Sequence, residues 1–314
     1  MLPYIGRRVL TAIPTLLIVT VMVFGIQRAL PGDPALMLAG EQQDPAVIAF
    51  IRAKYRLDEP VPVQYAAWLG QLVRGDLGVS LRTNEQVLDL IASKLPVTIE
   101  LSILSLLVAL VLAIPTGVMA AVRKGKAADY GGTILALTGL SIPNFWLGIM
   151  LILLVSVRLG WLPASGYVPL SEGVWDNLRR MIMPSFVLGT GLAAVLMRQM
   201  RSSMLGVLKQ DFVRTAHAKG QRRSTVIVRH ALRNALNPVM TILGLQLGAL
   251  LSGAVLTEQV FTLPGFGKLV VDAVFNRDYA VVQGVVVVTA VAYIAINLVV
   301  DVMYAVLDPR ISAR

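Results

Sequence analysis

The chain has few residues with reactive side chains, and both of its histidines fall in one polar stretch, residues 211–238. His217 and His230 lie there among arginines and lysines, and the chain contains no cysteine. Nucleophilic catalysis needs a nucleophile beside a base, and a zinc protease carries a ligand set such as H-E-x-x-H. Neither pattern occurs in the sequence. We therefore expect no catalytic residue, no metal site and no cofactor bound by this chain.

Four polar residues interrupt long apolar runs elsewhere in the sequence: Asn144, Gln246, Asn297 and Asp301. A polar side chain inside a membrane is costly, so each of them is a candidate for lining a transport path. Each also fits the alternative role of a hydrogen-bond partner between helices. Asn297 and Asp301 are one helical turn apart, as a pair in an ion-coupled secondary transporter would be. For Asp301, an ion pair with a lysine or arginine at the cytoplasmic side is the structural alternative.

The composition places these residues in a membrane protein. Hydrophobic residues make up 56% of the 314, charged residues only 15%, and the mean hydropathy is +0.73. Such values point to lipid as the solvent. The net charge of +10 is then better explained by topology signals and contacts with lipid headgroups than by nucleic acid. We expect the lipid bilayer, and no nucleic acid, as a partner.

Six apolar runs approach the length of about 20 residues that a helix needs to cross a bilayer. They cover Val9–Ile26, Val97–Val122, Gly132–Val157, Met181–Met197, Val239–Val260 and Gly284–Leu307. Pro14, Pro115 and Pro143 fall inside these runs, which neighbouring helices make tolerable in a membrane. The first run lacks a following small-residue cleavage site, so we interpret it as a retained span. The sequence predicts an all-α integral membrane protein with six transmembrane helices.

The distribution of positive charge predicts that both termini are cytoplasmic. With the N-terminus inside, the termini, residues 123–130 and residues 198–237 share one side, which holds 16 of the 28 lysines and arginines. That side has only three of the 18 acidic residues. Cytoplasmic loops carry such an excess of Lys and Arg. The loop over residues 31–95 is then on the outer side.

The outer loop has helical signals of its own. Asp44 is a suitable N-cap for a helix whose first turn holds Pro45, and an apolar stripe follows at helical spacing. That stripe consists of Val47, Ile48, Ile51 and Tyr55. A second short helix is expected over Tyr65–Val73, and the sequence "GDLGVSL" at 75–81 predicts extended chain. The loop is either a helical cap on the outer mouth or a contact surface for an external partner.

The polar stretch at 211–238 predicts a helix, a tight turn and a second helix. Asp211 is a plausible N-cap that pairs with Arg214, and Gly220 is placed to end the first helix. The second helix is expected to start near Ser224 and to end at Asn237-Pro238. Its apolar face would hold Val228, Ala231, Leu232 and Ala235, and its basic face Arg222, Arg229 and Arg233. One interpretation is a basic loop that binds anionic headgroups.

Within this stretch, "RTAHAKG" followed by "HALRNALNP" resembles the cytoplasmic loop signature of ABC-importer permeases, E-A-A-x3-G-x9-I-x-L-P. Arg214, Thr215 and Ala216 stand at the E-A-A positions and Gly220 at the glycine. His230, Leu232 and Arg233 stand at the I, L and P positions, and such departures resemble the variant of the dipeptide, oligopeptide and nickel branch. Further collinear similarities to that branch are "LPGDP" at 30–34, "GDLGVSL" at 75–81, "LPGFGKL" at 263–269, "RDY" at 277–279 and "NLVVDVMYAVLDPR" at 297–310. Overall the chain is most similar to the dipeptide-permease type.

The resemblance implies a type I ABC importer permease fold and an ATP-driven transport function. It implies that the helix before the glycine is a coupling helix that docks in a groove of an ATPase subunit. The coupling residues would be Asp211, Arg214, Thr215, Ala216, His217, Ala218, Lys219 and Gly220. The chain has no G-x-x-x-x-G-K-[ST] sequence, so ATP and Mg are expected on partner ATPases. The alternative is the ion-coupled secondary transporter, although no internal repeat is visible.

The same resemblance implies the partners and the organisation. The partners would be a homologous second permease in a heterodimer, two ABC ATPases and an external substrate-binding protein, at the inner (cytoplasmic) membrane. Residues 1–93 would form the first transmembrane helix and the outer loop, residues 94–307 the transmembrane core with the coupling loop 198–237, and residues 308–314 a cytoplasmic tail. Dipeptides, longer peptides, haem, glutathione and nickel chelates all remain open as cargo.

Overall fold

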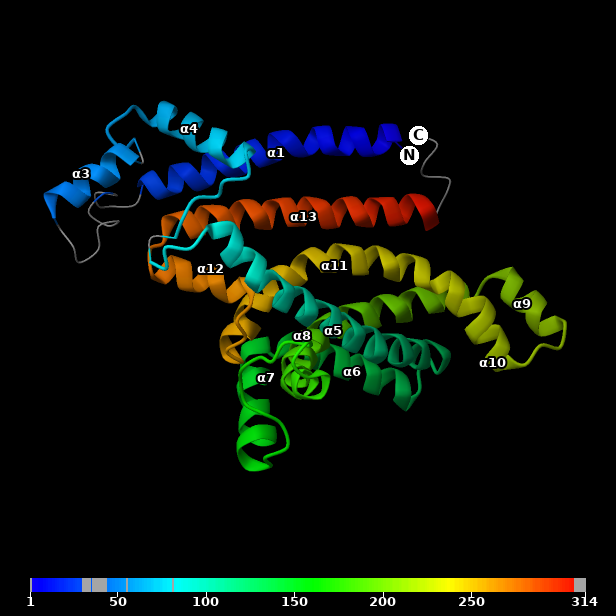
Figure 1. The fold of residues 1–314 in the computed structure, drawn as a ribbon. Helices are drawn as coiled ribbons and strands as arrows, with labels where there is room; N and C mark the ends of the chain where they lie inside the picture. The colour runs from blue at the N-terminus through cyan, green and yellow to red at the C-terminus, as the bar shows by residue number, and fades with distance from the viewer. Residues whose placement is uncertain (1, 30–34, 36–43, 55, 81, 308–314) are drawn as a thin grey trace. The chain divides into compact units, whose positions relative to one another are not determined.

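Helices form nearly all of the protein, as its apolar runs predict (Figure 1). The computed structural model describes residues 2–29, 35, 44–54, 56–80 and 82–307. Within these ranges there is no β-strand, only an isolated bridge between Val79 and Gln86. The chain divides into two compact units. The first comprises Met1–Leu95 and Leu269–Leu298, and the second comprises Pro96–Lys268 and Val299–Arg314.

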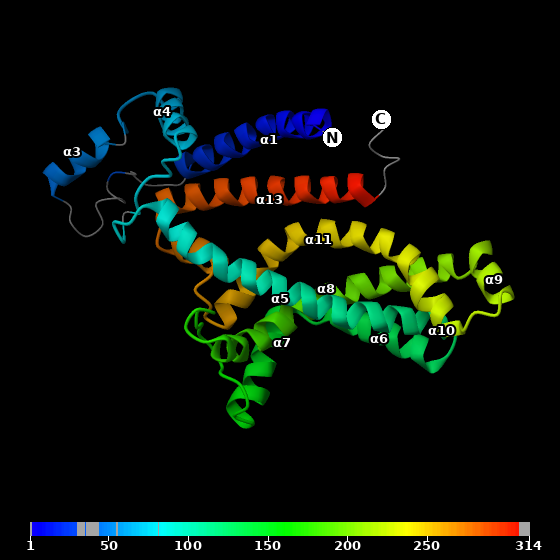
Figure 2. The same cartoon turned by 45° about the vertical axis from the view of Figure 1, so that its right-hand side comes forward.

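The first unit contains two long helices that run side by side in both views, α1 and α13 (Figures 1 and 2). Its helices are α1 (Leu2–Ala29), α3 (Pro45–Lys54), α4 (Val61–Val73), most of α12 (Phe266–Phe275) and most of α13 (Tyr279–Leu307). The outer-loop helix α4 is tied to α1 by polar and aromatic contacts. The hydroxyls of Thr20 and Tyr65 are 2.9 Å apart, Arg28 donates to the Gln64 side chain, and the Phe24 and Tyr65 rings are 5.5 Å apart. The α4 part of the loop therefore packs on α1.

Most of the local predictions for the outer loop are confirmed. The Asp44 carboxylate accepts a hydrogen bond from the Ala46 N–H at 2.9 Å, and Pro45 opens α3. Ile51 is buried, and Val47 and Ile48 are half-buried, whereas Tyr55 and residues 30–34 lie outside the described residues. The second helix starts earlier than predicted, at Val61, because Pro60 and Pro62 suit its first turn. Extended chain was predicted over 75–81, but Gly75 and Gly78 have φ values of +82° and +87° and only Val79 forms a β-bridge; the Ser80 hydroxyl donates to the Asp278 carboxylate at 2.5 Å.

The second unit packs its helices around α8, which has buried residues from Asn177 to Val207. Its helices are most of α5 (Val87–Val122), α6 (Ala127–Ser141), α7 (Asn144–Leu151), the π-helix η1 (Ile152–Arg158), α8 (Val174–Val207), α9 (Asp211–Ala218), α10 (Arg223–Thr225), the π-helix η2 (Val226–Leu232) and α11 (Arg233–Val260). Met181, Leu196, Met200 and Met204 on α8 are fully buried. Gly189 lets α5 approach closely, because a Cβ there would be 2.7 Å from the Ser105 carbonyl oxygen.

Three helices in the described residues are long and apolar enough to cross a membrane: α5, α8 and Tyr279–Val300 of α13. The helix over Leu10–Ile26 is apolar but shorter, and α11 covers the predicted span Val239–Val260. The predicted span Gly132–Val157 is not a single straight helix: it is divided between α6 and the α7–η1 segment, which together are apolar enough for a fourth, broken span. The chain bends by 98° between α6 and the α7–η1 segment. Pro143 stands at this break, since proline disfavours a helical conformation in the residue before it.

A buried carboxylate closes the end of α11. Glu258 is fully buried in the last turn of this helix and accepts hydrogen bonds from the Thr98 hydroxyl and the Lys268 backbone N–H. The Thr98 oxygen in turn accepts the Phe266 N–H at 2.8 Å. A Cβ at Gly265 would overlap the Glu258 carboxylate, so the loop reaches it only with glycine. These bonds satisfy the backbone N–H groups at the start of α12.

We expect Thr98→Val to destabilise the protein more than Thr98→Ser. Valine has the shape of threonine but lacks the hydroxyl that joins Glu258 to the Phe266 N–H, and a lost buried hydrogen bond of this kind costs about 1–3 kcal/mol. Serine keeps the hydroxyl and removes only a methyl group. Thermal unfolding of the purified chain in detergent measures the difference. Equal losses for the two variants would show that the hydroxyl contributes nothing.

Candidate coupling site

The short helix predicted before Gly220 is present as α9, Asp211–Ala218. Val213 and Ala216 are buried and belong to the hydrophobic core of the second unit, where α9 packs against η2. Every other residue of α9 is exposed, including the predicted coupling residues Asp211, Arg214, Thr215, His217 and Ala218. Lys219 and Gly220 after the helix are exposed as well. The helix is therefore firmly backed on one side and open on the other.

The start of α9 differs from the prediction. Gln210, not Asp211, is the N-cap residue, and it makes no side-chain capping hydrogen bond. Asp211 is the first helical residue, where its negative charge interacts favourably with the helix dipole. The predicted pair with Arg214 is present at 3.4 Å. Both side chains are highly exposed, so the pair contributes little stability.

The end of α9 matches the prediction in detail. Gly220 has a φ of +74°, in the left-handed region that favours glycine. Its N–H donates to the His217 carbonyl at 2.9 Å, and the Gln221 N–H donates to the Ala216 carbonyl at 3.3 Å. These two bonds form a Schellman motif with glycine at its usual C′ position. The turn is fixed by its hydrogen bonds and by the conformation of one glycine.

The second predicted helix does not end at Asn237-Pro238, and this prediction is wrong. The chain is helical from Arg223 to Val260, through α10, η2 and α11, and Pro238 lies inside α11. A π-helix has more residues per turn than an α-helix, so the side chains of η2 point in other directions than α-helical spacing predicts. Val228, predicted on the buried face, is therefore 63% exposed. Ala231 and Ala235 are buried and Leu232 half-buried, as predicted. The predicted basic face, Arg222, Arg229 and Arg233, is exposed.

Two side-chain contacts that the sequence analysis missed hold this region in place. His230 Nε2 lies 2.8 Å from the Gln221 side-chain oxygen and joins the turn after α9 to η2. Asp129 and Arg201 form a two-point ion pair, with Nε–Oδ1 at 2.6 Å, and the Gly125 N–H also donates to Asp129. This pair connects the first turn of α6 to α8. An acid in the otherwise basic 123–130 loop was the signal that could have revealed it.

The four candidate path residues are divided between the two units of the chain. Asn144, in the second unit, is half-buried at the start of α7, with its amide 3.2 Å from where a Cβ on Gly191 of α8 would stand. Gln246 on α11 of the second unit and Asn297 on α13 of the first unit are half-buried. The side chain of Asp301 lies outside the described ones. Asn144 thus fits the alternative of a contact between helices.

Glu100 and Phe212 are further residues that the sequence analysis overlooked. Glu100 lies inside the predicted span Val97–Val122, and its Oε2 accepts a hydrogen bond from the Tyr167 hydroxyl at 2.7 Å. Burial, followed by this bond, raises the pKa of Tyr167 to about 12, so its hydroxyl stays a donor at neutral pH.

Phe212 is 37% exposed on α9, a large apolar side chain on a helix whose other exposed residues are mostly polar.

Comparison with known proteins identifies the family. Residues 113–313 match the model described as "Binding-protein-dependent transport system inner membrane component", and residues 1–102 match its N-terminal membrane component model. The chain belongs to this family. The family description specifies a transport component and not an enzyme, in agreement with the resemblance noted above. The two matches together span nearly the whole chain.

Three relatives align with this chain over nearly the full length of both sequences. The oligopeptide transport system permease protein AppB of Bacillus subtilis is 45% identical over 99% of this chain and 100% of its own. The dipeptide transport system permease protein DppB of Escherichia coli is 42% identical, and the glutathione transport system permease protein GsiC of Salmonella choleraesuis is 43% identical, each over the full length of both chains. A solved amino acid ABC transporter aligns with 71% of this chain and 94% of its own, at 13% identity and a TM-score of 0.49.

We expect Gly220→Val to loosen the end of α9 and Gly220→Asn to do so much less. Nothing lies within 4 Å of a Cβ at this position, so the cost is one of backbone conformation and not of a clash. A left-handed conformation costs an ordinary residue about 1–2 kcal/mol, and asparagine tolerates it better than a β-branched residue. Hydrogen exchange should therefore be faster at the Gln221 amide in the valine variant. Equal exchange in both variants would contradict this explanation.

Proposed function

We propose that this family member is the membrane-spanning permease subunit of an ATP-driven ABC importer for peptides, and that α9 couples it to an ATPase. The observation that carries the coupling proposal is the placement of α9: Val213 and Ala216 bury one side in the core of its unit, and the rest of its surface is exposed, with Phe212 at 37% exposure beside the buried side. An exposed helix with a large apolar anchor suits docking into a groove of a partner. Because Val213 and Ala216 fix α9 to the helices behind it, a push on its exposed side would be transmitted to them.

Peptide cargo is supported by the names of the full-length relatives, which are permeases of oligopeptide, dipeptide and glutathione transport systems. All three substrates are peptides or, for glutathione, a small peptide derivative. We therefore infer a peptide or peptide-like solute and leave haem and nickel chelates as less supported alternatives. The candidate path residues remain Gln246, Asn297 and Asp301, whereas Asn144 is better explained as a contact between helices.

The proposed assembly contains a homologous second permease, two ABC ATPases that bind ATP and Mg, and an external substrate-binding protein. One chain offers one coupling helix, whereas two ATPases need two, so a second permease completes the set. The proposed topology in the inner membrane has six spans and both termini in the cytoplasm. Residues 94–307 would then form the transport core with its inner loop 198–237, residues 1–93 the first span and outer loop, and residues 308–314 a cytoplasmic tail.

The coupling proposal predicts that Phe212→Ala weakens the association with the ATPases. Loss of an apolar anchor in a docked groove is expected to reduce co-purified ATPase about tenfold, or about 1.4 kcal/mol. Val228→Ala is the matched control, because Val228 is an exposed apolar residue on η2, outside α9. Co-purification of the complex and ATP-dependent uptake into vesicles are the measurements.

The alternative, a loop that binds anionic headgroups, predicts a different pattern. Replacing both Arg222 and Arg223 by glutamine would then impair uptake, while Phe212→Ala would leave the ATPases bound. That outcome would reject the docking role of α9. The docking proposal instead requires near-normal uptake in the double arginine variant.

The topology can be tested with single cysteines, since the natural chain has none. Val73 at the end of α4 is 81% exposed and Lys219 after α9 is exposed, so both positions can be labelled. We expect a membrane-impermeant maleimide to label Val73→Cys in intact cells and Lys219→Cys only after lysis. Labelling of both in intact cells would refute the proposed sidedness.

A further inference from the structure

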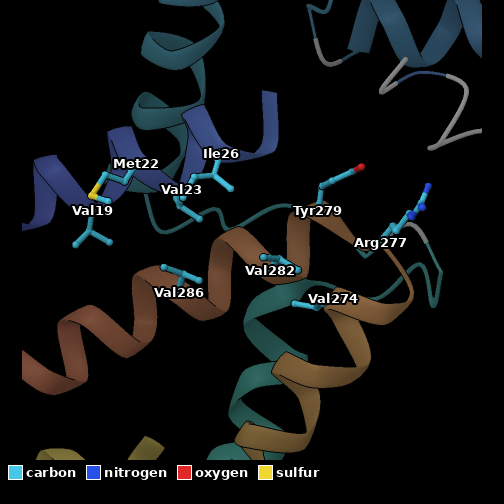
Figure 3. A pocket seen from close by; sticks show the side chains of 9 residues that line it. All are labelled: Val19, Met22, Val23, Ile26, Val274, Arg277, Tyr279, Val282 and Val286. Atoms are coloured by element: carbon cyan, nitrogen blue, oxygen red, sulfur yellow. The ribbon is translucent and has the colours of Figure 1, made fainter. Parts of the chain in front are cut away.

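An apolar groove lies between α1 and α13 in the first unit, with a positive charge at one end. It has a volume of about 540 Å³ and is lined by Val19, Met22, Val23, Ile26, Val274, Arg277, Tyr279, Val282 and Val286. Figure 3 shows the side chains of α1 facing Val282 and Val286 across the gap, while Arg277 and Tyr279 extend at one end. The volume is in the range of about 300–1,000 Å³ that small-molecule sites have.

We propose that this groove is a binding site for one phospholipid, with an acyl chain between α1 and α13 and the phosphate at Arg277. The groove runs beside a helix, Tyr279–Val300, that is long and apolar enough to span a membrane. Arg277 and Tyr279 stand just at the start of that helix, where arginine and tyrosine meet lipid headgroups. From Tyr279 to Val286 the helix rises about 10 Å at 1.5 Å per residue, within the depth of one leaflet.

The charge at the mouth of the groove has no partner within the described part of the chain. No ion pair or side-chain hydrogen bond of Arg277 occurs there, and the neighbouring Asp278 carboxylate accepts the Ser80 hydroxyl instead. Arg277 is exposed beside the apolar side chains of the groove, so its guanidinium can bind an anion that a lipid brings to this end. A phosphate oxygen of a phospholipid supplies this, and an anionic headgroup such as phosphatidylglycerol supplies net charge as well.

Arg277 is one of four residues other than glycine that have a positive φ in the described part of the chain. Arg277 has a φ of +54° and occupies the C′ position of a Schellman motif after α12, with the Asp278 N–H bonded to the Ala273 carbonyl at 2.9 Å and the Arg277 N–H bonded to the Val274 carbonyl at 3.1 Å. The equivalent position after α9 holds Gly220. Glycine is the residue that this conformation favours, so an arginine here is retained at a conformational cost.

A helix of a partner subunit fits the groove less well than an acyl chain. Close helix packing in membranes uses small residues such as glycine, alanine and serine, whereas none of the lining residues is small in this sense. Met22, Ile26 and Val274 are more than half exposed, so the groove opens to its surroundings, which for a spanning segment is the hydrocarbon. A flexible chain can follow such an irregular apolar surface.

The test compares retained lipid in three variants by native mass spectrometry of the purified complex. Protein is extracted from vesicles of equal parts phosphatidylcholine and phosphatidylglycerol. Arg277→Gly removes the charge and relieves the left-handed strain, Val282→Phe fills the groove, and Arg74→Gln removes an exposed charge of the same unit as a control. We expect one retained phosphatidylglycerol in the natural protein and in Arg74→Gln, and about fivefold less in the other two.

Thermal unfolding in lipid-free detergent separates lipid binding from folding. Arg277→Gly should unfold at the same temperature as the natural protein or a higher one, although it loses lipid. Retention of phosphatidylglycerol by Arg277→Gly at the natural level would overturn the proposal. Loss of the second permease from Arg277→Gly and Val282→Phe with unchanged lipid would overturn it in favour of a protein interface. In vesicles where diacylglycerol replaces phosphatidylglycerol, retention of diacylglycerol at the same level would overturn the role of the phosphate.

Discussion

The requirement that backbone polar groups be satisfied without water governs this structure. In the long helices, intrahelical hydrogen bonds satisfy the backbone groups. Where a helix ends inside or near the apolar region, side chains must supply the missing hydrogen-bond partners. Glu258 does this at the end of α11, where its carboxylate and the Thr98 hydroxyl receive the N–H groups that open α12. The glycines of the 263–268 loop follow from this, because only they leave room for the carboxylate.

The second unit combines this rule with close packing to make a rigid support for α9. Gly189 brings α5 against α8, and the Asp129–Arg201 pair fastens α6 to α8. Val213 and Ala216 then join α9 to the same core, so the exposed side of α9 belongs to the body of the unit and not to a loose loop. A transport function that depends on a partner's movement needs such a firm connection. This packing is the physical basis for the proposal that α9 couples the chain to an ATPase.

Sequence reasoning succeeded where the signal was local and failed where it depended on neighbours. The Asp44 cap, the Gly220 turn and the family resemblance follow from residue types at fixed spacing, and the structure or the comparisons bear them out. The bend at Pro143 and the helix through Pro238 share one cause. Whether a proline breaks a membrane helix depends on which groups nearby can satisfy the freed carbonyl, and the sequence does not state this. Likewise, the exposure of Val228 depends on a π-helical turn, which no residue type in the sequence "VIVRHAL" predicts.

The π-helix η2 determines the direction in which each side chain of α11 points around the helix axis. One residue more or less in a helix turns the downstream part by about 100°. Without the wider turn at Val226–Leu232, Ala235, Val239 and Glu258 would therefore point in other directions around the axis of α11. The direction of the Glu258 carboxylate at the end of α11 thus depends on η2, which ends more than 25 residues before it. A single-residue deletion in η2 would rotate all of α11 about its axis, and the hydrogen bonds of Glu258 at the other end of the helix would be lost.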